Sequence, residues 1–356
     1  MALSVLEAAL LNPAPSQLLQ IAKIGIVRLM KGSISRREFT ARMALPFLAL
    51  AIPGCEDNNN SRNRYIVSEL SPSYEDAVSS IQKKIEQESA DAAIRPEGIS
   101  LLYTHGKPVR HAVVLFHGFT NVPRQFKELA QAYFQNGCNV FVPRLPRHGL
   151  KDRMTTDLAN LTIAEIQNSA DEAYSVARGL GKSVSVIGLS LGGSMALWLT
   201  QTQPVDLTVP IAPFLMPIGY PEAAINAAAR LAYVLPSFYC FWDSKLKESS
   251  LPNYAYPGYP SHAMAQLVFF GDQISRTAAI SKPLAKRCIL VTNVGENAVN
   301  NDVARRLLAL WNAKGAHYTE LILRNLGPPR HDIIDPVTFP QGRTLVYPVL
   351  EKLVSG

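Results

Sequence analysis

The run from Ser183 to Trp198 constrains the fold more than any other stretch of the chain. It begins with β-branched apolar residues, Val184, Val186 and Ile187, in the pattern of a buried parallel strand. It then passes through Gly188-Leu189-Ser190-Leu191-Gly192 into small and apolar residues with helical spacing. A strand, Gly-x-Ser-x-Gly and a helix in this order predict a tight, strained turn that projects the serine hydroxyl from the sheet.

The glycines of this turn have a physical explanation. A side chain at Gly188 or Gly192 would crowd the turn, and Gly193 lets the helix close on the strand. The helix N-terminus adds positive potential at the place where an oxyanion would form. The same five residues also fit an ordinary glycine-rich turn in which Ser190 only caps the helix, so the rest of the chain must decide between these alternatives.

Composition excludes several classes of protein. With 356 residues, 47% of them hydrophobic and 18% charged, the chain can bury a large core, and an α/β fold of this length often forms one domain. The net charge of +7 is spread, with no basic stripe that carries interleaved aromatics, so we expect no binding to nucleic acid. The four cysteines are far apart and form no C-x-x-C, which argues against a zinc site and a disulfide framework.

Residues 1–64 are interpreted as a targeting segment and a polar tether. Ser35-Arg36-Arg37-Glu38-Phe39 resembles a bacterial twin-arginine export signal, and a short apolar run follows at residues 43–51. This run is too short to cross a bilayer, which takes about 20 residues, so it fits a cleaved signal better. Ile52-Pro53-Gly54-Cys55 resembles a lipobox, in which the cysteine is lipidated and becomes the mature N-terminus. Residues 56–64 are polar and asparagine-rich, as a tether would be.

We therefore expect an exported lipoprotein, attached through Cys55 on the outer side of the bacterial inner membrane or in the periplasm. The alternative is a cytoplasmic protein in which this region is a helix with an incidental Arg-Arg pair. Export signals rarely carry a leader as long as residues 1–29, so a translation start at Met30 is a further hypothesis.

Residues 65–356 alternate between apolar strand patterns and amphipathic helix patterns, which predicts a mostly parallel α/β sheet. Besides the strand and helix around Ser190, strands are expected at 99–103, 110–116, 139–143, 207–211, 287–292 and 318–324. Helices are expected at 71–91, 126–136, 164–180, 303–314 and 339–354. Residues 217–262 are rich in proline and aromatics and are too long for a plain connection, so they are expected to form a small cap.

Four motifs come in one order along the chain: His117-Gly118-Phe119-Thr120, the loop 143–149, Gly188 to Gly193, and His331-Asp332. In this respect the chain resembles the α/β-hydrolases, closest in pattern to bacterial carboxylesterases and monoacylglycerol-lipase-like enzymes, over roughly residues 95–356. The resemblance implies an α/β-hydrolase fold, a mostly parallel central sheet flanked by helices with a small aromatic-rich cap. It implies no metal and no cofactor.

The resemblance also assigns the base and the oxyanion donors. The family places its catalytic histidine after the last strand, and His331 is the one histidine in the loop 325–335. The oxyanion hole would use the backbone N–H groups of Leu191 and Phe119. His117 and His148 stand in loops where histidine usually has a structural role. Arg147 replaces a common glycine and is expected to alter the mouth of the site.

The acid of a triad is less obvious. It is expected in the loop 293–302, where alignment of Val299 with the family's valine puts Glu296 in the acid position. A shift by one residue would put the uncharged Asn297 there. Asp302 is the other local carboxylate, but it falls in the first turn of the next helix, where the helix dipole already explains a negative charge. Glu296 is the prediction, with Asp302 as the alternative.

These assignments predict a serine hydrolase that cleaves carboxylic esters with an apolar acyl group through an acyl-enzyme, with a small-molecule ester as its partner. Lysophospholipase, monoacylglycerol lipase, thioesterase and C–C bond hydrolase are alternatives on the same fold. A lipid-anchored binding protein without catalysis is an alternative of a different class. The sequence leaves the oligomeric state open.

Overall fold

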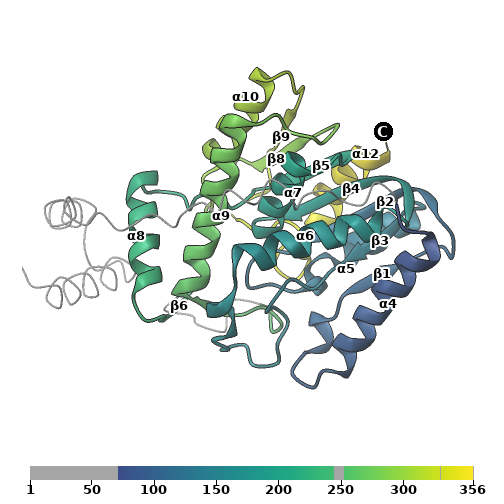
Figure 1. Cartoon of the computed structure of the whole chain (residues 1–356), viewed down its shortest axis with the longest axis horizontal. Helices are drawn as coiled ribbons and strands as arrows, with labels where there is room; N and C mark the ends of the chain where they lie inside the picture. The colour runs from purple at the N-terminus through teal and green to yellow at the C-terminus, as the bar shows by residue number, and fades with distance from the viewer. Residues whose placement is uncertain (1–70, 244–251, 329, 356) are drawn as a thin grey trace, which may run out of the picture. The chain divides into compact units, whose positions relative to one another are not determined.

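The computed structural model describes residues 71–243, 252–328 and 330–355. The predicted targeting segment, with Cys55, lies outside the described residues. The central sheet has seven strands in the order β1-β3-β2-β4-β5-β8-β9 (Figure 1). β1 is antiparallel to β3, and the other neighbouring strands are parallel. Their bounds are β1 Leu101–Tyr103, β2 Val109–Phe116, β3 Asn139–Val142, β4 Gly181–Leu189, β5 Leu207–Ile211, β8 Ile289–Asn293 and β9 Thr319–Leu323.

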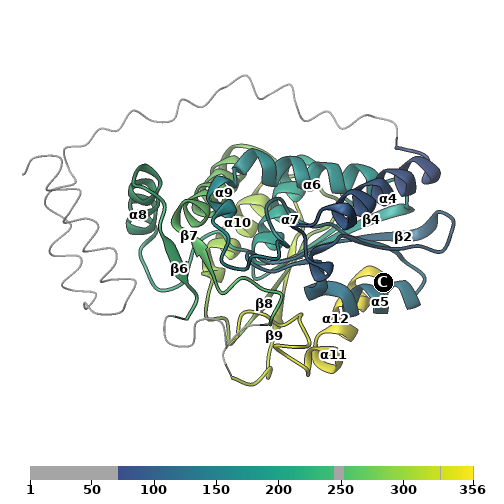
Figure 2. The same ribbon diagram turned by 90° about the horizontal axis from the view of Figure 1, so that it is seen from below.

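Helices cover both faces of this sheet, as Figure 2 shows. One face carries α4 (Tyr74–Ala90), α6 (Ile163–Ala177), α7 (Leu191–Thr202), α9 (Ser261–Ile280) and α10 (Asn301–Ala313). The other carries α5 (Lys127–Gln135), α11 (Gly342–Leu345) and α12 (Tyr347–Ser355). The architecture is the one expected from the sequence, a mostly parallel sheet between helical layers. Among the described residues, no helix is long and apolar enough to span a bilayer.

Local sequence explains how the elements begin. β4 is buried over its last six residues, and a strand covered on both faces needs such a continuous apolar run. α6 starts with a capping box, in which Thr162 accepts from the Glu165 amide and the Glu165 carboxylate accepts from the Thr162 amide. The Asn300 side chain caps α10 through the Asp302 amide.

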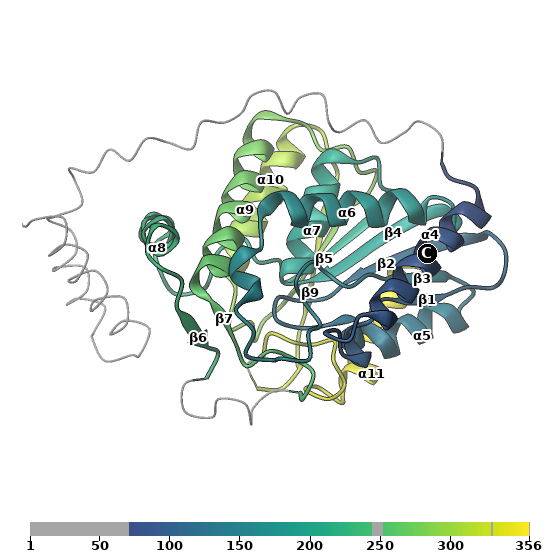
Figure 3. The same cartoon turned by 60° about the horizontal axis from the view of Figure 1, so that its bottom comes forward.

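The segment 217–262 contains its own small elements. It holds α8 (Glu222–Val234) and a two-stranded antiparallel hairpin of β6 (Tyr239–Phe241) and β7 (Gly258–Pro260). α8 packs on α9, on the side away from the central strands (Figure 3). The sequence analysis did not predict α9. It packs closely enough that a Cβ at Gly271 would lie 2.3 Å from the Leu215 carbonyl oxygen.

The C-terminal helix differs from the prediction. One helix was expected over 339–354, but the structure has α11 and α12 with a break at Val346. Pro348 is the second residue of α12. A proline inside a helix has no N–H to donate and its ring clashes with the carbonyl four residues earlier, so a single helix through this point is disfavoured.

Candidate active site

Ser190 stands between β4 and α7 with φ 58° and ψ −114°, a conformation that non-glycine residues rarely adopt. A Cβ at Gly188 would lie 2.1 Å from the Gly192 carbonyl oxygen, and one at Gly192 would lie 2.1 Å from the Phe116 carbonyl oxygen. The turn therefore closes only with glycine at both positions. Ser190 is 8% exposed, and among the described residues its hydroxyl has no hydrogen-bond partner.

The backbone around Ser190 is well bonded, which is how the strained conformation persists. The Ser190 amide donates to the Ile211 carbonyl at 3.0 Å, which joins the turn to the end of β5. The Ser190 carbonyl accepts from the amides of Ser194 at 2.9 Å and Phe214 at 3.0 Å. These three hydrogen bonds hold the backbone of Ser190 in its strained conformation.

His331 and Glu296 meet across two loops that follow neighbouring strands, β9 and β8. His331 Nδ1 lies 2.8 Å from Glu296 Oε1, and because a carboxylate only accepts, Nδ1 is the donor. Nε2 is thereby left as the nitrogen that can take a proton. Since parallel strands end at one edge of the sheet, both loops and Ser190 share that edge.

The Glu296 side chain is only 4% exposed, yet its hydrogen bonds favour the ionised form. Oε1 also accepts from the amides of Ala298 at 2.8 Å and Val299 at 3.1 Å. Burial by itself would raise the pKa of Glu296, but the hydrogen bond and charge of His331 and the two amides outweigh it and lower the pKa. An ionised carboxylate at Nδ1 orients the imidazole ring and fixes its tautomer.

The alternative acids lie elsewhere. Asp302 is in the first turn of α10, where its side chain is 71% exposed and pairs with Arg305 at 2.8 Å. Asn297 is exposed. Of the three candidates, the structure brings Glu296 to His331.

Two backbone N–H groups are the candidate donors of an oxyanion site. Leu191 is the first residue of α7, and Phe119 follows the end of β2. Among the described residues, neither amide has a hydrogen-bond acceptor. The loop that carries Phe119 lies against the serine, since a Cβ at Gly118 would be 3.7 Å from the Ser190 Cβ. Both predicted donors therefore belong to segments that adjoin Ser190.

Comparison with known proteins accounts for this arrangement. Residues 113–335, well over half of the chain, match the family model described as the alpha/beta hydrolase family. The chain belongs to that family.

The chain is also similar to individual proteins. It is 31% identical over 170 residues to a thermostable monoacylglycerol lipase of Bacillus sp. strain H-257, a match that covers 48% of this chain and 64% of that protein. The fold matches a metagenome-derived lipolytic enzyme with TM-score 0.56 and 19% identity, over 74% of this chain and 99% of that one. It matches the monoacylglycerol lipase of Paleococcus ferrophilus with TM-score 0.54 and 19% identity, over 72% and 98%.

Two neutral histidines connect the loops of the candidate site. His117 Nε2 accepts from the Leu145 amide at 3.2 Å, and His148 Nε2 accepts from the Thr120 amide at 3.2 Å. Each Nδ1 lies close to a backbone carbonyl and donates to it. Burial lowers the pKa of His117 well below its usual value and that of His148 to about 4, although the Pro146 carbonyl opposes the shift at His148. Both rings are fully buried and bridge the Phe119 loop to the loop 143–149.

Arg147 has its charge balanced within the fold. It pairs with Glu165 at 2.9 Å and Asp157 at 3.0 Å. The hydrogen bond to Glu165 first, and then the charges of Glu165 and Asp157, raise the pKa of Arg147 further above its usual value. The residue thus connects the loop 143–149 to the start of α6.

Gln125 is a site residue that the sequence analysis did not single out. Its buried Oε1 accepts from the Gly118 amide at 2.8 Å, and Nε2 donates to Asp332 Oδ2 at 2.7 Å. It therefore links the Phe119 loop to the residue after His331. Its two contacts lie 7 and 207 positions away, so no local pattern signals the role.

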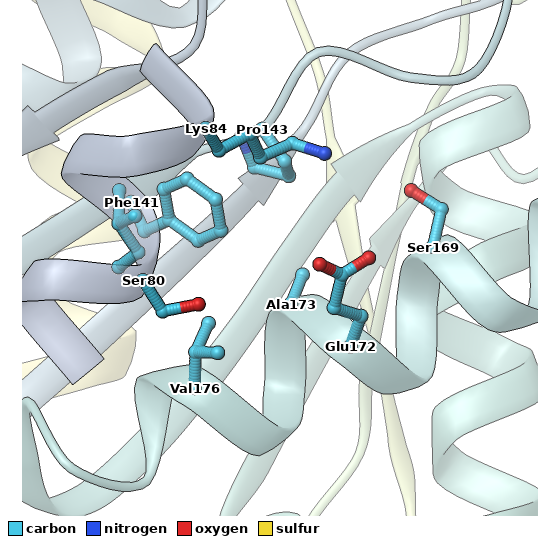
Figure 4. A pocket seen from close by; sticks show the side chains of 9 residues that line it. Ser80, Lys84, Phe141, Pro143, Ser169, Glu172, Ala173 and Val176 are labelled. Atoms are coloured by element: carbon cyan, nitrogen blue, oxygen red, sulfur yellow. The ribbon is translucent and has the colours of Figure 1, made fainter. Parts of the chain in front are cut away.

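Two hollows lie apart from this site. One, between α4 and α6 beside Lys84 and Glu172 (Figure 4), has a volume of about 10 Å³, room for about one water molecule. The other, of about 360 Å³, is lined by Tyr239 and Pro260 on one face of the hairpin. Tyr259 projects from the opposite face and contacts Phe119. Among the described residues, no group of three or more His, Cys, Asp or Glu is arranged to hold a metal ion.

Proposed function

We propose that this alpha/beta hydrolase is a serine hydrolase of carboxylic esters. The observation that carries the proposal is the Glu296–His331 hydrogen bond, at the same edge of the sheet as the strained Ser190. A neutral serine hydroxyl is a weak nucleophile and needs a base, and an imidazole held by a buried carboxylate is such a base. The similarity to a monoacylglycerol lipase supports the same reaction class.

In the proposed reaction, Ser190 Oγ attacks the ester carbonyl carbon while His331 Nε2 takes the hydroxyl proton. The amides of Phe119 and Leu191 donate to the oxyanion of the tetrahedral intermediate. His331 returns the proton to the leaving alcohol, and an acyl-enzyme on Ser190 remains. Water, deprotonated by His331, then attacks the acyl carbon and releases the acid and the free serine.

Aromatic side chains suggest the substrate class. Phe119, Trp242 and Tyr259 contact one another, with ring centroids 4.5 to 6.2 Å apart, beside the proposed oxyanion donor. An apolar acyl group would bury its surface against such a cluster. We therefore favour esters with an apolar acyl chain, a monoacylglycerol being the specific candidate. Lysophospholipid and thioester substrates are the alternatives that use the same machinery.

The test combines a covalent probe with a graded substrate panel. A fluorophosphonate should label Ser190, and the Ser190→Ala variant should be unlabelled. p-Nitrophenyl esters of increasing chain length and a monoacylglycerol should be hydrolysed by the wild type and not by Ser190→Ala or His331→Ala. Because the triad acts as a unit, the double variant should be about as inactive as either single variant. Well-folded wild type that neither labels nor hydrolyses these esters would refute the proposal.

The cellular location is proposed from the N-terminal motifs. We propose attachment to a membrane through a lipidated Cys55 after twin-arginine export. In a bacterial host with that export route, Cys55→Ser should move the protein from the membrane fraction to a soluble fraction. Full-length protein in the cytoplasm, with residues 30–55 still attached, would contradict this.

A further inference from the structure

Thr120 adopts a backbone conformation that is rare for its residue type. Its φ is 63°, in the left-handed region, although it is β-branched. It directly follows Phe119, whose amide is a proposed oxyanion donor, so an anchored Thr120 fixes the C-terminal side of Phe119 and limits how far that N–H group can turn. A conformation of this kind persists only where surrounding contacts impose it.

Those contacts use the polar groups of Thr120 fully. Its amide donates to His148 Nε2 at 3.2 Å, and its carbonyl accepts from the Tyr256 amide at 2.8 Å. Its hydroxyl donates to the Phe119 carbonyl at 2.6 Å, so Thr120 also holds the residue that carries the proposed donor N–H. The hydroxyl then has only acceptor capacity left.

Trp242 fills that acceptor. Its indole Nε1–H donates to Thr120 Oγ1 at 2.8 Å across 122 positions of sequence. The Trp242 amide donates to the Pro257 carbonyl at 3.1 Å, which ties it to the segment that leads into β7. The ring meets Phe119 edge-on at 6.2 Å and Tyr259 at 4.5 Å, yet Trp242 is 44% exposed.

We propose that Trp242 is a positioning residue for the oxyanion hole. Through its hydrogen bond to Thr120, the inserted hairpin holds the Phe119 N–H in the direction that the developing oxyanion requires. The insertion then helps to orient an oxyanion donor, in addition to covering the acyl group. This inference rests on the proposed esterase function and adds a residue that supports stabilisation of the tetrahedral intermediate.

The role predicts which kinetic constant changes. A donor that is misdirected loses more interaction with the tetrahedral oxyanion than with the ground-state carbonyl, so kcat falls while KM changes little. A residue that only binds the acyl chain would raise KM, and its effect would grow with chain length.

The experiment compares Trp242→Phe, which keeps an aromatic ring without the N–H, with Thr120→Val, which keeps the branched shape without the hydroxyl. On p-nitrophenyl acetate and butyrate, Trp242→Phe should lower kcat roughly tenfold with KM nearly unchanged, the effect of losing one hydrogen bond. Thr120→Val should lower kcat at least as much. Thr120→Val removes the bond from Trp242 and also the donation to the Phe119 carbonyl, so the double variant should lose no more than Thr120→Val alone. Thr120→Ser should retain most activity.

A transition-state analogue gives a second readout. A trifluoromethyl ketone, which forms a tetrahedral oxyanion on the serine, should bind Trp242→Phe weaker by the same factor as the loss in kcat. The control is Tyr233→Phe, an exposed aromatic on α8 that contacts His262 and Phe269, and it should match the wild type.

Three results would overturn the inference: unchanged kcat in Trp242→Phe, a loss confined to KM that grows with acyl length, or single-variant losses that multiply in the double variant. A lower melting temperature with unchanged kcat would likewise mean a purely structural role. Failure of the proposed function is distinguishable, because the wild type would then show no hydrolysis that depends on Ser190.

Discussion

Glu296 and His331 act as one unit because one carboxylate oxygen serves the imidazole and two amides together. The amides of Ala298 and Val299 fix the carboxylate in its loop, and the carboxylate fixes the ring. A glutamate side chain has one more methylene than an aspartate, and the loop after β8 accommodates that length here.

Glu296→Gln should keep the fold and lower kcat by roughly two to four orders of magnitude, since an amide neither stabilises the imidazolium nor enforces the tautomer. Asp302→Asn is the matched control, a nearby carboxylate in the first turn of α10 whose partner is Arg305. It should change kcat little. Steady-state kinetics with circular dichroism checks both, and the reverse pattern would assign the acid to Asp302.

His148 makes stability depend on pH. Its folded pKa, about 4, is below the unfolded value of 6.5, so between these values the unfolded chain binds a proton that the folded protein does not. Stability from this group is therefore full above pH 6.5 and falls as the pH drops toward 4, by up to about 3 kcal/mol. His117 shifts in the same direction and adds to the loss.

Urea unfolding at pH 7 and pH 4.5 measures this dependence. His148→Asn should be less stable than the wild type at pH 7 and should lose less stability on acidification. His317→Asn, which changes an exposed histidine, serves as the control and should keep the wild-type dependence. An identical pH dependence in His148→Asn and wild type would contradict the assignment.

At the scale of elements, the site depends on one strand-to-helix turn and on loops that end neighbouring strands. Ser190 directly follows β4, and the Phe119 loop follows β2. The loops that carry Glu296 and His331 follow β8 and β9. The turn after β4 is the least tolerant of these, because backbone atoms rather than flexible side chains fill the space beside its glycines.

Gly192→Ala tests that turn. Alanine in a helix is ordinarily about 1 kcal/mol more favourable than glycine, but here its Cβ would lie 2.1 Å from the Phe116 carbonyl oxygen. The variant should lower the melting temperature by several degrees and abolish ester hydrolysis. Gly137→Ala, whose Cβ meets no atom within 4 Å and whose φ is 83°, should cost only its backbone strain and keep activity. Wild-type activity in Gly192→Ala would show that the turn can shift.

At the scale of the whole molecule, the described hydrolase fold begins near α4, whose first turn is capped by Ser73. α4 contributes Ala77 and Ile81 to the core. The predicted polar tether precedes this helix in the sequence.

A chain that starts at Ser61 retains α4 and every site residue, so it should be soluble and as active as the full-length protein on p-nitrophenyl esters. Removal of residues 1–90 would also delete the core contacts of α4 and should destabilise the fold. Thermal unfolding and kcat measured on both truncations separate the two cases. Loss of activity on truncation at Ser61 would show that the preceding residues contribute to the folded enzyme.

Local pattern was sufficient for much of this architecture. The apolar run of β4, the glycines around Ser190 and the alternation of strand and helix patterns are properties of neighbouring residues. The strands of the central sheet were predicted to within a few positions, whereas β6 and β7 were not predicted. The break before α12 had a local signal in Pro348 that the sequence analysis did not use. α9 carried a weaker signal, because its buried residues are spread around much of the helix and do not form one clear apolar stripe.

The contacts between distant segments were decided only by the tertiary structure. The loop sequence left Glu296 and Asp302 both open, and the paths of β8 and β9 bring one of them to His331. Gln125 reaches Asp332, and Trp242 reaches Thr120, over separations of 207 and 122 positions. Residue type and spacing determine which chemistry a chain can attempt, whereas hydrogen-bond partners so far apart depend on how the sheet orders its strands and places its insertion.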